Sequence, residues 1–135
     1  MSQENVEIVN RAYEAMNDRE FSRMPEFLDP DVEFDLSRNI LNPDVYRGYA
    51  GFERLVSVIE DVWDDFRFEV QELIDAGDRV VADVTVSGKG RGSGVAANMQ
   101  VFNIWTLRYG KVLRLAGVYR TRAEAIEAVG LREGS

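Results

Sequence analysis

The chain has 135 residues, enough for one domain that buries about two-thirds of its unfolded surface without a metal ion or disulfide. It contains no cysteine and no histidine, which excludes a disulfide framework, a thiol nucleophile and a histidine-ligated metal site. Its 24 acidic and 16 basic residues give a net charge of −8, which repels the phosphates of nucleic acids and anionic membrane surfaces.

The beginning of the chain lacks the basic and apolar regions of a signal peptide, and nowhere do about 18 apolar residues follow one another. We therefore expect a cytoplasmic protein that has neither nucleic acid nor membrane as a partner. We also expect no cofactor and no metal ion. Residues 1–135 show no linker or internal repeat, so a single domain is predicted.

Two helices are predicted at the N-terminal end. The first covers residues 3–17, where apolar side chains recur at helical spacing, namely at Val6, Val9, Tyr13 and Met16. The second is shorter and has Ser22 as its N-cap, which places Pro25 in the first turn, where proline is tolerated. It should end before Asp29-Pro30.

The next region changes from strand to loop to helix. Residues 31–36 alternate acidic and apolar side chains, which predicts a short strand with Asp35 near its end. An irregular loop should follow over residues 37–49. The clearest helix of the chain is predicted over residues 51–65, whose apolar stripe is wide enough to pack across a sheet.

The remaining sequence predicts four antiparallel strands and a last helix. Period-two alternation begins at Phe66, and residues 80–87 form the next alternating segment after a turn. The glycine-rich residues 88–94 lack the GxxxxGK[ST] pattern of a phosphate loop and predict a flexible hairpin connection. Strands over residues 95–108 and 111–120 follow. A capping box that begins at Thr121 then starts a helix that Gly130 terminates.

The strand over residues 95–108 carries apolar side chains on both faces. Met99, Val101, Asn103 and Trp105 share one face, and Phe102 and Ile104 share the other. Both faces of this strand should therefore be covered. We expect the chain's own helices on one face and a second subunit on the other.

This order of elements predicts an α+β fold with helices on one side of the sheet. The stretches VEIVNRAYEAMN, FLDPDVEF, YRGYAGFERL, VQELIDAGDRVVADVTVSGKGRGSG, FNIWTLRYGKVLRL and TRAEAIEAVGL resemble successive blocks of SnoaL-like proteins of the NTF2-like superfamily. The resemblance covers essentially the whole chain. It implies a cone, in which three N-terminal helices pack on a curved, mainly antiparallel sheet with a short C-terminal helix, and a homodimer through the sheet face.

The resemblance also implies candidate catalytic residues. Relatives include ketosteroid isomerase, limonene epoxide hydrolase, scytalone dehydratase and polyketide cyclases, which act on small, mostly apolar molecules. In the isomerases, an aspartate after the first strand is the base, and a helix tyrosine and a protonated aspartate hold the oxyanion. Asp35 is the nearest residue to the position of that base, Tyr13 to that of the tyrosine, and Asn103 stands where the isomerases have the acid.

Each of these residues also has a purely structural interpretation. Asn103 equally serves to satisfy buried backbone groups. Asp35 lies one position from the aligned base, and a shift of one residue in a strand moves a side chain to the other face, where it is a solvated carboxylate. Tyr13 lies on the apolar stripe of its helix, and the simpler interpretation is a tyrosine of the hydrophobic core.

Other chemistries of the family are less well supported by the residues. The absence of histidine excludes a dehydratase mechanism based on histidine and aspartate. An epoxide hydrolase needs an Asp–Arg–Asp arrangement on the sheet, for which Asp83, Arg114 and Arg120 are the residues available. The predicted lining of a small-molecule pocket consists of Phe34, Trp63, Met99, Val101, Trp105 and Tyr119.

Two functional hypotheses remain open at this stage. The first is a domain with a pocket for a small hydrophobic molecule and isomerase- or cyclase-like acid–base chemistry at Asp35 and Asn103, assisted by Tyr13. The second is a non-catalytic dimeric domain that binds a hydrophobic ligand or a protein. The orientation of the Asp35 carboxylate distinguishes between them.

Overall fold

The computed structural model describes residues 2–39 and 43–130 of the chain. Within these residues the helices and strands are, in order, α1 (Ser2–Asn17), η1 (Phe21–Glu26), β1 (Leu28–Asp35), β2 (Val45–Arg47), α2 (Gly48–Val62), β3 (Trp63–Ala76), β4 (Arg79–Gly90), β5 (Ala96–Arg108), β6 (Lys111–Tyr119) and α3 (Arg122–Ala128). The fold is α+β, as the order of predicted elements indicated.

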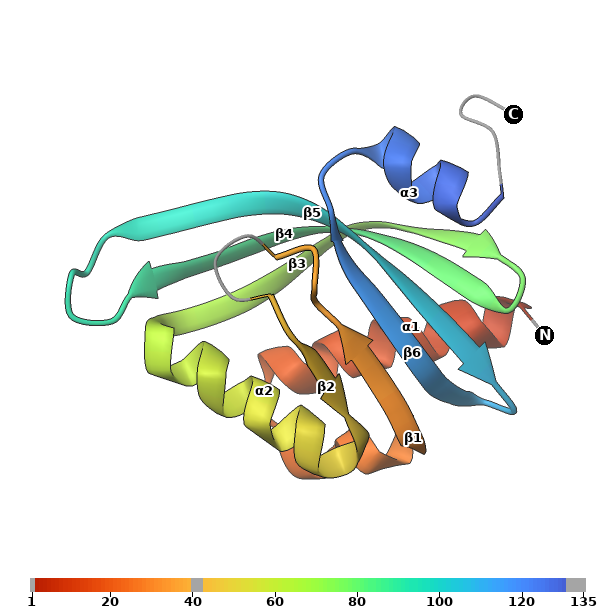
Figure 1. Ribbon diagram of the computed structural model, residues 1–135, viewed down its shortest axis with the longest axis horizontal. Helices are drawn as coiled ribbons and strands as arrows, with labels where there is room; N and C mark the ends of the chain where they lie inside the picture. The colour runs from red at the N-terminus through yellow and green to blue at the C-terminus, as the bar shows by residue number, and fades with distance from the viewer. Residues whose placement is uncertain (1, 40–42, 131–135) are drawn as a thin grey trace.

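The six strands form one curved, mixed sheet in the order β2-β1-β6-β5-β4-β3 (Figure 1). β1 and β6 pair in parallel, and the other neighbouring strands pair antiparallel. The prediction of a mainly antiparallel sheet is therefore confirmed. β4 and β5 form a long hairpin whose tip extends well beyond the end of β6 (Figure 1).

The helices lie on both faces of the sheet. α1, η1 and α2 cover the concave face, where the larger apolar core includes Val9, Met24, Phe34 and Trp105. α3 lies on the opposite face, over a smaller core that contains Phe102 and Ile104 (Figure 1). The expectation that all helices share one side is therefore wrong. The chain's own C-terminal helix covers the apolar residues that had suggested a second subunit.

Three local predictions differ from the structure. The second helix is a six-residue 3₁₀ helix, and its N-cap is Glu20, without a side-chain cap, rather than Ser22. Three N-terminal α-helices are therefore not confirmed. The loop over residues 37–49 contains the short strand β2, and α2 begins at Gly48, three residues before the predicted start. The predicted N-cap at Thr121 is confirmed, because its side chain accepts a hydrogen bond from the Glu124 backbone N–H at 3.2 Å.

α1 is fastened to the outer edge of the sheet at β3. The Asn17 side-chain amide donates to the Phe68 carbonyl at 2.7 Å, and its oxygen accepts from the Phe68 N–H at 2.8 Å. Asn17 thus pairs with β3 as a neighbouring strand would. Arg19 adds a hydrogen bond to the Phe66 carbonyl. The end of α1 is held against the edge of the sheet, and this fixes the position of the Tyr13 side chain one turn earlier.

Candidate functional site

The concave face of the sheet and the helices α1 and α2 enclose a cavity of about 570 Å³. Tyr13 contributes to its lining from α1, Phe52 from α2, and Asn103 and Trp105 from β5. Most of the residues that line it are apolar. A cavity of this size and composition is typical of sites for small molecules.

Three side chains form a hydrogen-bonded cluster in the wall of this cavity. The Tyr13 hydroxyl oxygen accepts a hydrogen bond from Asn103 Nδ2 at 3.1 Å and another from Trp105 Nε1 at 3.0 Å. All three residues are buried, with exposed fractions of 1%, 6% and 0%. The Tyr13 and Trp105 rings also meet edge to face, with centroids 5.0 Å apart. The structure therefore brings together two of the three predicted catalytic residues, and it adds Trp105 to them.

The surroundings of Tyr13 determine the protonation state of its hydroxyl group and the hydrogen bonds that it can make. Burial raises the pKa of Tyr13 to about 12, although the hydrogen bonds from Asn103 and Trp105 act to lower it. The hydroxyl therefore stays protonated at neutral pH. Asn103 Nδ2 and Trp105 Nε1 both donate to its oxygen, and among the described residues its own O–H donates no hydrogen bond. Tyr13 is one of the residues that line the cavity, which makes its O–H a candidate hydrogen-bond donor.

Asn103 is held in place by the strand beside it. A Cβ atom added to Gly117 of β6 would clash with Asn103 Oδ1. Only glycine allows the two strands to approach at this point without moving the Asn103 amide. The close approach helps to fix the direction in which Asn103 Nδ2 donates to Tyr13.

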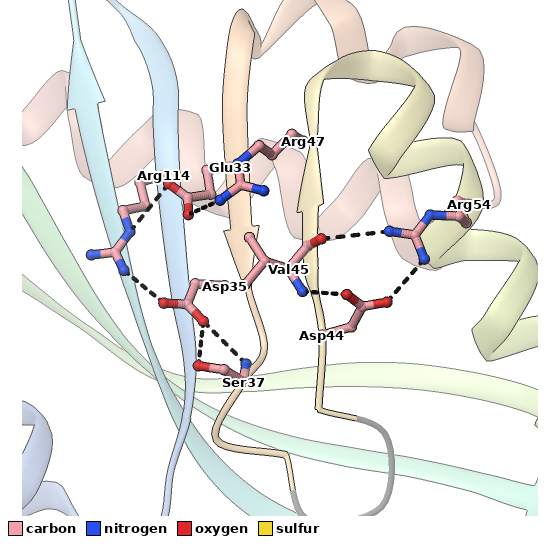
Figure 2. A network of polar contacts seen from close by, with 8 residues as sticks. All are labelled: Glu33, Asp35, Ser37, Asp44, Val45, Arg47, Arg54 and Arg114. Carbon is pink, nitrogen blue, oxygen red and sulfur yellow. Dashed lines mark hydrogen bonds and ion pairs between the residues drawn. The ribbon is translucent and has the colours of Figure 1, made fainter.

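Asp35, the candidate base, lies on the other face of the sheet (Figure 2). Its neighbour Phe34 lines the cavity, and alternation along β1 turns Asp35 away from it. The side-chain hydrogen bond from Ser37 is the largest of the effects that hold the pKa of Asp35 below its usual value; Arg114 also lowers it, while burial opposes them. Ser37 Oγ donates to Asp35 Oδ1 at 2.6 Å, and Arg114 Nη2 donates to Oδ2 at 2.7 Å. The structure does not bring Asp35 together with Tyr13 and Asn103.

Asp35 belongs to a network of ion pairs on the outer face of the sheet (Figure 2). Arg114 pairs with Glu33 at 3.9 Å as well as with Asp35, and Arg47 pairs with Glu33 at 3.7 Å. Asp83 is also on the outer face, where it accepts a hydrogen bond from Gln100 at 2.9 Å. An epoxide-hydrolase arrangement of Asp83 and Arg114 inside the cavity is therefore not formed.

Five of the six residues predicted to line a pocket do line the cavity, namely Phe34, Trp63, Met99, Val101 and Trp105. Tyr119 does not, because it lies on the α3 face and pairs with Phe102. The pairing of β5 and β6 is irregular between Phe102 and Ile104. Such an irregularity reverses the faces of the residues beyond it. The Arg38 guanidinium lies over the Tyr119 ring, 4.1 Å from its centroid.

Sequence reasoning did not identify the charged residues at the open side of the cavity. Arg91, in the β4–β5 hairpin, pairs with Asp64 at 3.0 Å and donates to the Glu60 carbonyl at 2.8 Å. Both charged side chains line the cavity. The glycine-rich run had suggested only a flexible connection, and Asp64 only a solvated helix end. Their separation of more than twenty residues leaves no periodic signal that could have linked them.

A second hollow, of about 690 Å³, lies between the start of α1 and the β5–β6 turn. Its charged residues Glu4, Asp78 and Arg108 are exposed to solvent. The cavity with Tyr13 is therefore the better candidate site. Across the described residues no three metal-ligating side chains converge, and no helix has the length and hydrophobicity to span a membrane.

Comparison with known proteins agrees with the fold. The model of the SnoaL-like domain matches residues 9–115. An NTF2-like protein from Burkholderia thailandensis E264 superimposes with a TM-score of 0.74 at 26% identity, over 82% of this chain and 86% of that one. An NTF2-like protein from Burkholderia pseudomallei K96243 has a TM-score of 0.76 at 21% identity, over 96% and 98% of the two chains.

The structure of TerC co-crystallized with polyporic acid is also similar. Its TM-score is 0.75 at 24% identity, and the match covers 94% of this chain and 98% of that one. A comparison with curated proteins finds no match.

Proposed function

Because this chain belongs to the SnoaL-like domain family, we propose that it binds a small, largely apolar molecule in the cavity between the sheet and helices α1 and α2. The single observation that carries this proposal is the Tyr13 hydroxyl. It is buried, protonated and held by two N–H donors, and its own hydrogen is left for a ligand.

The hydrogen-bonding pattern specifies the chemistry of the ligand's inner end. The Tyr13 oxygen already accepts from Asn103 and Trp105, so a ligand hydroxyl or amine that needs an acceptor finds none at this atom. A ligand oxygen that accepts, such as a ketone or quinone carbonyl, receives the Tyr13 hydrogen. In an apolar cavity this hydrogen bond also polarises the carbonyl.

The apolar wall supports a ligand with ring or branched hydrocarbon character. The rings of Phe34 and Phe52 pack at a tilt in the wall, with centroids 5.6 Å apart, and Trp63 and Val86 contribute on the side of the β4–β5 hairpin. Flat apolar ligand surfaces gain most from such aromatic walls. The structure of TerC with polyporic acid, a protein of the same fold, supports the choice of small organic molecules as test compounds.

Isomerase- or cyclase-like catalysis in the same cavity is the second candidate function. It is favoured by one observation, the Asp64 carboxylate that lines the cavity beside Arg91. In such a reaction Tyr13 would stabilise charge on the carbonyl oxygen while a carboxylate removes a proton from the neighbouring carbon. Asp35 does not serve as that base, because it lies on the outer face.

The experiment is a thermal-shift screen followed by calorimetric titration. Steroid-like, polyketide-like and terpenoid ketones are compared with the corresponding alcohols, since a ligand that binds the folded state raises the melting temperature. We expect at least one ketone to bind more tightly than its alcohol. Tyr13→Phe should weaken the binding of that ketone by roughly threefold to tenfold, which corresponds to the loss of one hydrogen bond of about 0.5–1.5 kcal/mol.

Two further variants make the result specific. Asp35→Asn, on the outer face, should leave the affinity unchanged, whereas Val86→Phe should block binding by filling the cavity without touching Tyr13. A flat response to every compound would overturn the proposal. So would a ketone that binds Tyr13→Phe and the wild type equally well. Turnover of a bound ketone by the wild type that is lost in Asp64→Asn would establish the second candidate.

A further inference from the structure

The sheet has an unpaired edge on β5, although β5 is not one of the two terminal strands. β6 pairs with β5 only as far as Phe102, which is opposite Tyr119. Among the described residues, no strand pairs with residues 96–101 on the side away from β4. This half of β5 belongs to the hairpin that projects beyond the rest of the sheet (Figure 1), and residues 96–100 are all exposed.

The backbone of this segment offers a regular row of unpaired groups. Val95 accepts a hydrogen bond from the Gly90 N–H at 2.9 Å. Because bonded and non-bonded pairs alternate along an antiparallel ladder, Ala96, Asn98 and Gln100 turn their N–H and C=O groups away from β4. An extended strand placed there would pair with every one of them.

The two terminal edges of the sheet are protected, and this edge is not. β2 is only three residues long, and β3 is rich in charged side chains and is paired at Phe68 by Asn17. Short strands, charges and covering elements are the usual means of preventing edge pairing. The segment Ala96-Ala97-Asn98-Met99-Gln100-Val101 has no charge and no proline.

Charge and symmetry favour a second copy of this chain as the occupant of this edge. Two copies of a chain with a net charge of −8 repel one another least where they meet through an uncharged segment. An antiparallel pairing of a segment with itself is also satisfied by a two-fold axis, since each copy supplies the same groups. A second copy of this chain therefore meets both conditions.

The cavity gives an independent reason for a neighbour at this position. Ala97, Asn98 and Met99 line its outer end, yet Met99 is 48% exposed and the adjacent Val95 is 65% exposed. These side chains are a wall that the single chain leaves uncovered. A strand added beside β5 would extend that wall and cover Met99.

We propose that residues 96–101 of β5 pair antiparallel with the same residues of a second copy, which joins the two sheets edge to edge and extends the wall of each cavity. This arrangement differs from a dimer through the sheet face. It does not depend on which ligand the cavity binds or on whether it binds one.

The first test measures mass by light scattering for the full-length chain and three variants. An edge of six residues buries less surface than a standard interface, so concentrations from about 1 to 100 μM are needed. Asn98→Pro removes an N–H that faces the partner and leaves the pairing with β4 intact, so it should be monomeric. Asn98→Ala keeps that N–H, and Thr85→Lys places a charge on the outer face of β4 without altering the backbone of β5. Both should remain dimeric.

The outcomes decide between the edge and the face. A wild type that stays monomeric throughout the range overturns the proposal. So does a dimer that persists in Asn98→Pro and is lost in Thr85→Lys, because that result identifies the sheet face. Circular dichroism and thermal unfolding of Asn98→Pro establish that the variant is folded.

A cross-linking test does not depend on the proline variant. The chain has no cysteine, so Ala97→Cys, Asn98→Cys, Met99→Cys and Gln100→Cys each introduce one thiol. In a two-fold antiparallel pair, the residue nearest the axis lies opposite itself, at a Cα separation of about 4.5–5.5 Å that suits a disulfide. We expect one of the four to form a covalent dimer rapidly under mild oxidation. Equal, slow cross-linking of all four and of Tyr109→Cys, at the distant exposed turn, would contradict the proposal.

Discussion

At Tyr13, burial and hydrogen bonding act on one proton in opposite directions. Burial is the larger effect and raises the pKa from 10.0 to about 12. The folded chain therefore holds this proton more tightly than the unfolded chain does. The resulting stabilisation is fully present below pH 10 and is lost as the pH rises from 10 towards 12.

A comparison of the wild type with Tyr13→Phe measures this effect. Phenylalanine leaves Asn103 Nδ2 and Trp105 Nε1 without their acceptor, which should cost about 1–3 kcal/mol at neutral pH. Above pH 10 the wild type should lose stability relative to the variant by up to about 1.4 kcal/mol per pH unit. Urea unfolding at several values of pH gives both numbers. A difference between the two proteins that does not change with pH would show that Tyr13 titrates equally in both states.

The polar residues of the site show what sequence can and cannot reveal at this scale. Tyr13 lies on the apolar stripe of a helix, and Asn103 shares a face with Val101 and Trp105, so both were predictable as inward-facing. The role of Asp35 as a base was doubtful because it lies one position from the aligned residue. The structure agrees, since the inward position is that of Phe34. The hydrogen bond from Trp105 was not predictable, because no pattern in a sequence gives the approach of a helix to a strand.

At the scale of elements, Asn17 attaches α1 to the edge of β3. Its amide satisfies both the N–H and the C=O of Phe68. Asn17→Ala should therefore lower the free energy of unfolding by about 1–3 kcal/mol, because it leaves two partly buried backbone groups unpaired. The loss is measured by urea unfolding.

Asn10→Ala is the matched control on the same helix. Asn10 donates to Glu14 at 3.1 Å on the exposed side of α1, so its removal should change stability by less than about 0.5 kcal/mol. Asn17→Ala should also aggregate more readily than the control, since it reopens an edge. Equal stabilities for the two variants would mean that the contact with Phe68 contributes nothing.

Elements with a clear period were predictable, and those set by tertiary contacts were not. The apolar stripes of α1 and α2 and the alternation of β4 were sufficient to identify these elements. β2 has three residues, too few for a period, and it exists because it pairs with β1. Pro25 lacks a backbone N–H, and the chain around it forms a 3₁₀ helix rather than an α-helix. Tyr119 faces α3 because of an irregular pairing that depends on two strands at once.

At the scale of the whole molecule, the absence of histidine predicts a flat response to pH near neutrality. Histidine is the only side chain whose unperturbed pKa lies between pH 5 and 8. The free energy of unfolding should therefore vary by less than about 0.5 kcal/mol between pH 6 and 8, well under the 1.4 kcal/mol that one group shifted by a full pKa unit would contribute. Chemical unfolding at constant ionic strength measures this. A steep slope in that range would require a carboxylate or amino group with a strongly shifted pKa.

The position of Trp105 beside Tyr13 gives the protein a built-in optical reporter. Its indole is completely buried, and its N–H donates to the hydroxyl of Tyr13, a residue that lines the cavity. A ligand that accepts a hydrogen bond from Tyr13 should change the electric field at this indole. The wavelength and intensity of the tryptophan fluorescence should change with it. Trp63 is the only other tryptophan in the sequence, so Trp63→Phe leaves Trp105 as the single tryptophan, which can be excited selectively over the tyrosines. Binding can then be followed by fluorescence without a label, even when the ligand has no colour of its own.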